Sequence, residues 1–285
     1  MRLAGALLVT LAAGAAGAGY WVLLAVVLAA AVAAGSSRLP ALADDPAGRI
    51  VGGLSRLAQI VVLAQAFGAY VFPLQPGYAA AALVVFVAAA DFAGLRLPDL
   101  LVKWVSGVLL AAGAVLVAMC LAVAPVPRTG GIGTPDAAAI VVAALFLLPF
   151  LIPEPGQRIT ARALGLGLVA VVVTAVTLFQ LGPIRLGLSG TAMRDLLSAA
   201  DAGQLQPLLT VIAVLATLPA AFTTFVGARQ RFAPSGGVPV AAGALLAAAA
   251  AAFAPLSAML LVAGLGAVAE LLLRMRARRY RGVHD

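Results

Sequence analysis

The sequence predicts an all-α integral membrane protein with about ten transmembrane helices. Of its 285 residues, 64% are hydrophobic and 10% are charged, and the mean hydropathy is +1.13. Soluble globular domains are about 45–50% apolar and about 25% charged, so a water-soluble fold of this size would lack polar surface. Long apolar runs between short charged segments therefore indicate one lipid-embedded domain that covers residues 1–285.

Ten apolar runs can serve as membrane spans, each of which needs about 20 residues, or fewer where the bilayer thins. They divide into a first half at 3–123 and a second half at 137–273, followed by a basic tail at 274–285. The predicted spans are 3–18, 21–35, 51–72, 78–93, 100–123, 137–152, 161–181, 205–227, 238–254 and 256–273. Nine spans remain the alternative if the first two form one helix, and the apolar start also leaves open a cleaved signal peptide.

The distribution of positive charge predicts the orientation. With ten spans and both termini in the cytoplasm, the inner side holds all Lys and Arg residues except Arg128, Arg185 and Arg194. Cytoplasmic loops carry this kind of excess, so we expect a multi-pass protein of the cell membrane. An aromatic group at the predicted outer boundary favours headgroup anchoring, and it consists of Tyr20, Trp21, Tyr70, Phe72 and Tyr78.

The outer loop at 183–204 carries a short amphipathic stretch. Its apolar positions are Leu188, Met193, Leu196 and Leu197. A short helix with one apolar face is typical of a segment that lies along a surface, so we expect this stretch to cap the outer end of the protein.

Glycine and proline interrupt the spans that open the two halves. The sixth span runs into "PFLIPEPGQRITARAL", which starts at Pro149, and the first span reads "LAGALLVTLAAGAAGAG". Proline removes a helix donor, and broken backbone survives in a bilayer only when protein buries it or it lines a wet cavity. Paired interruptions are typical of transporters built from inverted repeats. The alternative is that Pro153 and Pro155 merely end a helix at the interface.

Several stretches resemble the amino acid–polyamine–organocation (APC) permeases, in the order and spacing of that superfamily. They are "GYWVLLAVVLAAAVAAGSSRLPALADDPAG", "AQAFGAYVFP", "DFAGLRLPDLLVKWVSGVLLAAG", "PEPGQRITARALGLGLVAVVV" and "TFVGARQRF". The resemblance covers nearly the whole chain, which looks like a shortened and divergent member. It implies a LeuT-like fold of two inverted five-helix repeats and secondary transport of amino acids or related amines, with a proton as the candidate coupling ion.

The resemblance also implies where substrate would bind. In the family, the substrate's amino and carboxyl groups lie at the unwound middles of the first and sixth spans, which correspond here to Ala4, Gly5 and Ala6 and to Phe146 through Phe150, including Pro149. Gln65 and Thr217 would line the same central site from spans three and eight. Helix–helix hydrogen bonding is the alternative role for these two polar residues.

Charged residues at the inner ends of spans are candidate gates. Glu154 and Arg158 are four residues apart, a spacing that favours an ion pair on a helix, and Arg162 follows one turn later. Asp91 and Arg96 form a second candidate pair at the end of span four. Solvated loop pairs of little energetic value are the alternative.

Glu270 is an ionisable residue within span ten, one turn before Arg274. A charged group at depth in the membrane is a functional candidate. Because Glu270 is close to the inner interface, the favoured prediction is that its side chain snorkels to the headgroup region.

Composition argues against other functional classes. The single cysteine and the single histidine argue against a His/Cys metal site, and the arginines form no basic face for nucleic acid. No nucleophile–base pair or carboxylate pair predicts an enzyme, and we expect no cofactor. A non-transporting permease-like protein that serves as a partner or regulatory subunit remains the alternative function, and a membrane-embedded lipid-processing enzyme is a third possibility.

Overall fold

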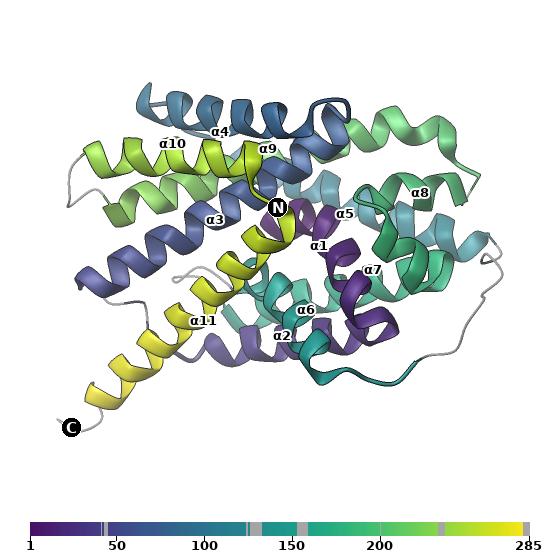
Figure 1. The fold of residues 1–285 in the computed structure, drawn as a ribbon, viewed down its shortest axis with the longest axis horizontal. Helices are drawn as coiled ribbons and strands as arrows, with labels where there is room; N and C mark the ends of the chain where they lie inside the picture. Colours follow the sequence, from purple (N-terminus) through teal and green to yellow (C-terminus); the bar gives the residue numbers. More distant parts are fainter. Residues whose placement is uncertain are drawn as a thin grey trace.

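The structure is a computed structural model that describes residues 1–40, 42, 45–123, 125, 133–152, 159–199, 201–232 and 237–281. Side chains at 159–162 and 278–281 fall outside this description. All regular secondary structure in the described residues is helical (Figure 1). In chain order the elements are α1 (Arg2–Ala18), η1 (Gly19–Trp21), α2 (Val22–Ser36), α3 (Pro46–Val71), α4 (Pro76–Phe92), α5 (Asp99–Ala122), α6 (Ala137–Leu151), α7 (Ile159–Leu188), α8 (Ala192–Ala199), η2 (Gly203–Leu205), α9 (Gln206–Phe232), α10 (Gly237–Phe253) and α11 (Leu256–Arg281).

Each of the ten predicted spans coincides with a helix, and the boundaries follow local chemistry. The Asp45 carboxylate accepts a hydrogen bond from the Gly48 amide at 2.8 Å and caps α3, with Pro46 in the first turn. The Asp136 carboxylate caps α6 in the same way. Between α1 and α2 the chain turns at Gly19, whose φ of +57° favours glycine. The first two spans are therefore separate helices.

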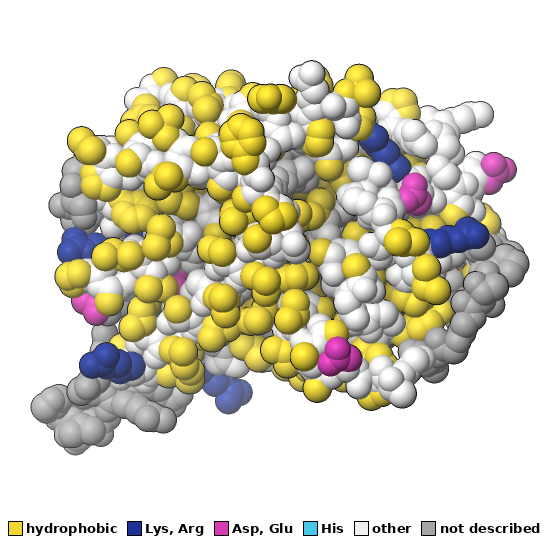
Figure 2. Space-filling model, in the orientation of Figure 1, with side chains coloured by type: hydrophobic (Ala, Val, Ile, Leu, Met, Phe, Trp, Pro, Cys, Tyr) yellow, Lys and Arg dark blue, Asp and Glu magenta, His cyan; other side chains and the backbone are white. Residues whose placement is uncertain are grey.

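Six helical segments are long and apolar enough to cross a membrane, so the protein is an all-α membrane protein. They are Arg2–Ser36, Pro46–Val71, Asp99–Ala122, Ala163–Leu188, Gly203–Phe232 and Leu256–Ala277, and α4, α6 and α10 are shorter apolar helices. Hydrophobic side chains cover most of the face in Figure 2, and most charged side chains in this view lie toward its left and right edges. An apolar belt between two charged ends is the surface that a bilayer requires.

The helices pack as two groups of four with two further helices alongside. In the first group, which we call the bundle, α1 and α2 each pack against both α6 and α7. In the second group, the scaffold, α3 packs against α4 and α9, and α10 packs against α4 and α3. Helix α11 lies against α3 and α6, whereas α5 lies against α7 and α9. The contacts of α1 with α9 and α3 join the bundle to the scaffold.

Two ends of the molecule are named from their residues. The α8 end comprises α8 and the turn between α3 and α4, and the arginine end comprises Asp91, Arg229, Arg231 and Arg274. Residues 192–199 form α8 with Met193, Leu196 and Leu197 buried, as the amphipathic pattern predicts, whereas Leu188 ends α7 and is exposed. The predicted tail at 274–285 continues α11 as a helix to Arg281.

Candidate functional site

The predicted break in the first span is wrong, because α1 is a continuous helix through Ala4, Gly5 and Ala6. The glycine instead permits close packing. A Cβ atom at Gly5 would lie 2.8 Å from Cδ2 of Leu63 on α3 and 3.1 Å from the carbonyl oxygen of Ala216 on α9. Gly5 is therefore a point of close contact between the bundle and the scaffold.

Helix α6 is also continuous through Pro149, which lies in its last turn, so the predicted unwound middle is absent there. Pro149 has no N–H group, so the carbonyl of Leu145 loses its helical donor. A Cβ atom at Gly264 of α11 would lie 2.5 Å from that carbonyl oxygen. The glycine thus lets the α11 backbone cover the carbonyl that the proline leaves free. Pro153 and Pro155 lie outside the described residues.

The other predicted central residues are only partly brought together. Phe146 and Phe150 are buried in the main hydrophobic core. Ala4 packs against a smaller cluster that includes Ala216, next to Thr217. The hydroxyl of Thr217 donates to the Ala213 carbonyl within its own helix at 2.7 Å, so this bond is not the helix–helix hydrogen bond that was its alternative role.

Gln65 points away from α1. Its amide nitrogen donates to the carbonyl of Ala254, between α10 and α11, at 2.8 Å. Its oxygen Oε1 is buried and has no hydrogen-bond partner. Gln65 therefore connects α3 to the end of α10.

Tyr70 is the main polar group at the α8 end. Its side chain is fully buried, and its hydroxyl donates to the Leu8 carbonyl of α1 at 3.1 Å and accepts from the Met193 amide of α8 at 3.2 Å. The Arg194 guanidinium of α8 donates to the Tyr70 carbonyl and lies 5.8 Å from the ring centroid. The prediction of a headgroup anchor is therefore wrong for Tyr70, whereas Phe72 and Tyr78 are exposed.

A groove of about 610 Å³ lies beside α8. The lining residues come from the end of α7, from α8 and from the segment between them, and are Leu181, Arg185, Leu188, Ser189, Asp195, Ser198 and Ala199. The kink in α7 at Gly182, with φ of +71°, and at Pro183 turns the end of that helix.

Asp91 pairs with an arginine that the sequence pattern did not suggest. Its Oδ2 atom lies 3.0 Å from Nε of Arg229 on α9, in an ion pair outside hydrogen-bond geometry. The predicted partner, Arg96, follows the turn at Gly94 and is exposed. The Asp91–Arg96 pair is therefore wrong, because the tertiary packing of α4 on α9 supplies a partner where local spacing suggested another.

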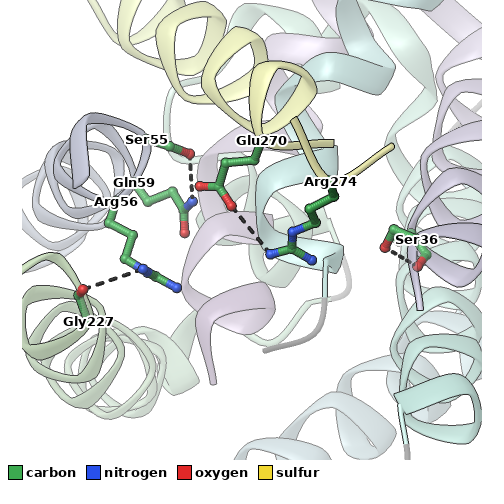
Figure 3. Close-up of polar contacts among 8 residues, drawn as sticks. Ser36, Ser55, Arg56, Gln59, Gly227, Glu270 and Arg274 are labelled. Carbon is green, nitrogen blue, oxygen red and sulfur yellow. Dashed lines mark hydrogen bonds and ion pairs between the residues drawn. The ribbon is translucent and has the colours of Figure 1, made fainter. Parts of the chain in front are cut away.

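A second polar cluster lies at the arginine end, between α3 and α11, and we call it the α3–α11 cluster. It consists of Ser55 and Gln59 from α3 with Glu270 and Arg274 from α11, and Figure 3 shows the Ser55–Gln59 contact and the Glu270–Arg274 contact in one view. Glu270 is 8% exposed and Arg274 is 6% exposed, with Nη2 of Arg274 lying 3.5 Å from Oε2 of Glu270. The prediction that Glu270 snorkels is wrong, because the carboxylate turns into the protein.

Three predicted gate residues are not placed. Glu154 and Arg158 lie outside the described residues, and the side chain of Arg162 is likewise not described. Among the residues that are described, no group of three or more His, Cys, Asp or Glu side chains could hold a metal ion.

The sequence matches no known protein-family model and no functionally curated protein.

Proposed function

We propose that the protein is a secondary-active transporter of amino acids or related amines that works by alternating access. In this proposal α1–α7 and α9–α11 all span the cell membrane, both termini are cytoplasmic, and these ten helices form two inverted five-helix repeats as in the APC permeases. The arginine end is then the cytoplasmic end, in agreement with the charge distribution of the sequence.

The helix packing carries this proposal. Let α1–α5 correspond in order to α6, α7, α9, α10 and α11. Exchanging the two halves then maps one contact onto another. The α1–α7 contact corresponds to α6–α2, the α4–α9 contact to α10–α3, and the α5–α9 contact to α11–α3. All six contacts are present. The pairs α1–α6, α3–α9 and α4–α10 map onto themselves and are also in contact. Two internally repeated halves predict such pairs, whereas the contact of α6 with α11 has no comparable counterpart between α1 and α5 among the described helices.

The same packing supports a rocking motion of the bundle against the scaffold. Gly5 lies between α3 and α9 and adjoins a hydrophobic cluster of Val105, Leu109 and Ala216 with Met1, Ala4, Ile212 and Leu215. Apolar contacts are non-directional, so separating these side chains from one another breaks no directional contact among them. At the α8 end, by contrast, Tyr70 joins α3 to α1 and α8. Substrate would enter this interface when α1 moves away from α9.

The first experiment measures thermal stability of the detergent-solubilised protein against amino acids, amines and nucleobases. A ligand that binds only the folded state raises the free energy of unfolding by about 2.7 kcal/mol when its concentration is a hundredfold above Kd. Stabilising compounds are then tested for uptake into proteoliposomes, with and without a proton gradient. We expect concentrative uptake of one amino acid or amine class. Absence of both stabilisation and uptake, in protein that unfolds cooperatively, would contradict the proposal.

A matched pair of variants tests the rocking interface. Gly5→Leu inserts a side chain between the bundle and the scaffold, whereas Gly107→Leu on α5 adds one where nothing lies within 4 Å. We expect uptake to be lost in the first variant and retained in the second. Equal uptake by both variants would show that separation of α1 from α9 is not part of transport.

The second candidate function is that of a non-transporting partner subunit with a permease-like scaffold. The observation that favours it is the aliphatic character of the contact around Gly5, where Leu63 and Ala216 fill the space beside α1. Protein that unfolds cooperatively, binds none of the panel and co-purifies with a defined membrane partner would support this function over transport.

A further inference from the structure

The α3–α11 cluster gathers buried charged and polar side chains from two helices. Ser55 is 1% exposed and Gln59 is 5% exposed, and both belong to α3. Glu270 and Arg274 belong to α11 and are also more than nine-tenths buried. Charged residues at membrane depth are costly and mark sites of function.

The hydrogen bonds within the cluster are long and incomplete. The Gln59 amide nitrogen lies 3.4 Å from the Ser55 hydroxyl, and the Glu270–Arg274 contact is 3.5 Å long. The oxygen Oε1 of Gln59 and the nitrogen Nε of Arg274 are buried without a hydrogen-bond partner. An unsatisfied buried polar group is costly, so the cluster offers one unused acceptor and one unused donor.

These groups match the two ends of an α-amino acid. An ammonium group donates up to three hydrogen bonds, for which the Glu270 carboxylate and Gln59 Oε1 are acceptors. A carboxylate accepts two parallel hydrogen bonds from a guanidinium, which Arg274 can supply through Nε and one terminal nitrogen. Bound ligand would therefore satisfy both of the unused atoms.

Two further arginines lie beside the cluster. Arg56 lies next to Gln59 on α3 and donates to the Gly227 carbonyl of α9 at 3.4 Å (Figure 3). Arg231 of α9 is close enough to Arg274 to interact with it electrostatically. Within the cluster, the group that would hold a ligand carboxylate is the Arg274 guanidinium, whose Nε is unused.

We propose that the α3–α11 cluster is a binding site for the ammonium and carboxylate groups of an α-amino acid, separate from the contact at Gly5. This inference rests on the proposed transport function and narrows its substrate to amino acids. A Cβ atom at Gly266 of α11 would lie 2.9 Å from the Cβ atom of Ser55, so α11 closes directly on α3 here. Ligand enters when α11 moves away from α3.

The test measures binding of three probes to the full-length protein in detergent by calorimetry. L-alanine carries both charged groups with a minimal side chain, L-alaninamide lacks the carboxylate, and propionate lacks the ammonium. We expect L-alanine to bind at least about tenfold more tightly than either analogue, the effect of about one charged hydrogen bond. Equal affinity for L-alanine and L-alaninamide would overturn the proposal.

Variants then locate the site. The double variant Glu270→Gln/Arg274→Gln removes both charges while keeping polar groups of similar shape, and neutralising a buried pair together is tolerated better than removing one partner. We expect at least a tenfold loss of L-alanine affinity. Gln59→Met removes the unused acceptor without touching a charge, and should weaken binding in the same direction. Arg276→Gln, on the exposed face of α11, is the matched control and should leave Kd unchanged.

The outcomes separate this site from the transport proposal. If the double variant binds L-alanine with wild-type affinity, or if the wild-type protein does not bind it at millimolar concentration, the site is refuted whether or not uptake occurs. If the wild-type protein binds L-alanine through these residues but takes up no compound, the site stands and the transport proposal fails.

Discussion

The two ends of the molecule are held together by different chemistry. At the α8 end, Tyr70 of α3 forms neutral hydrogen bonds to α1 and α8, so the contact crosses between the scaffold and the bundle. At the arginine end, the Asp91–Arg229 ion pair joins α4 to α9, both within the scaffold, and Glu270–Arg274 lies within α11.

This difference predicts which contact can hold the bundle and the scaffold together and which cannot. If the bundle and the scaffold separate as proposed, a hydrogen bond that crosses between them must break, so we expect Tyr70 to hold the α8 end closed. An ion pair within one group stays intact while that group moves as a rigid body, so Asp91–Arg229 stiffens the scaffold without closing the molecule. The four predictions below test this distinction.

The largest expected effect comes from Tyr70→Phe. The variant loses both hydroxyl contacts and leaves the Met193 amide buried without this partner, which costs about 2–3 kcal/mol. We expect a lower midpoint of thermal unfolding in detergent. A second readout uses Thr10→Cys on α1, made in protein that carries Cys120→Ser; the Thr10 hydroxyl is buried without a partner. We expect the introduced thiol to be alkylated faster when Tyr70→Phe is present than when Tyr70 is retained.

Tyr78→Phe is the matched control, because Tyr78 is 68% exposed and its hydroxyl should contribute little. Identical unfolding midpoints for the two phenylalanine variants would show that the Tyr70 hydroxyl does not hold the α8 end closed.

Arg229→Gln should have the next largest effect. It leaves the Asp91 carboxylate buried without its ion-pair partner, and we expect a loss of about 1–2 kcal/mol, since the Arg229 side chain is 34% exposed and partly screened by solvent. Arg96→Gln makes the same substitution at the residue that sequence spacing suggested, and should change stability by less than about 0.5 kcal/mol. A larger loss of stability from Arg96→Gln than from Arg229→Gln would show that Asp91 pairs with Arg96.

Gly5→Ala should lower the free energy of unfolding by about 1 kcal/mol. Overpacking against Leu63 and Ala216 costs about 1–3 kcal/mol, and the better helix propensity of alanine returns up to about 1 kcal/mol. Gly107→Ala on α5 gains propensity without a clash and should raise the unfolding midpoint. If Gly5→Ala is equally stabilising, then α1 and α9 are not in close contact at this position.

Gln65→Leu should have the smallest effect, about 0.6 kcal/mol, which is typical of a single interhelical hydrogen bond in a membrane protein. It removes the bond to the Ala254 carbonyl, a contact inside the scaffold. Uptake should be unaffected, and a loss of uptake with unchanged stability would return Gln65 to the substrate pathway.

Much of the fold could be predicted from the sequence, because apolar runs of membrane length and their Gly, Pro and Asp boundaries are local signals. All ten predicted ranges match helices, and the amphipathic pattern at 192–199 located α8. The role of particular residues could not be predicted in this way. Glycines in the first span indicate either a broken helix or close packing, and only the position of Leu63 and Ala216 decides for packing at Gly5.

The sequence by itself determined that this protein is helical and embedded in lipid, since composition and apolar periodicity act along the chain and need no partner. Tertiary structure alone decided which polar groups meet. The sequence predicted an interfacial anchor at Tyr70, but α1 and α8 supply hydrogen-bond partners that bury it. The sequence predicted a snorkelling side chain at Glu270, but the packing of α11 against α3 leaves it buried. Such pairings join residues far apart in the chain, and they depend on helix packing that leaves no local pattern in the sequence.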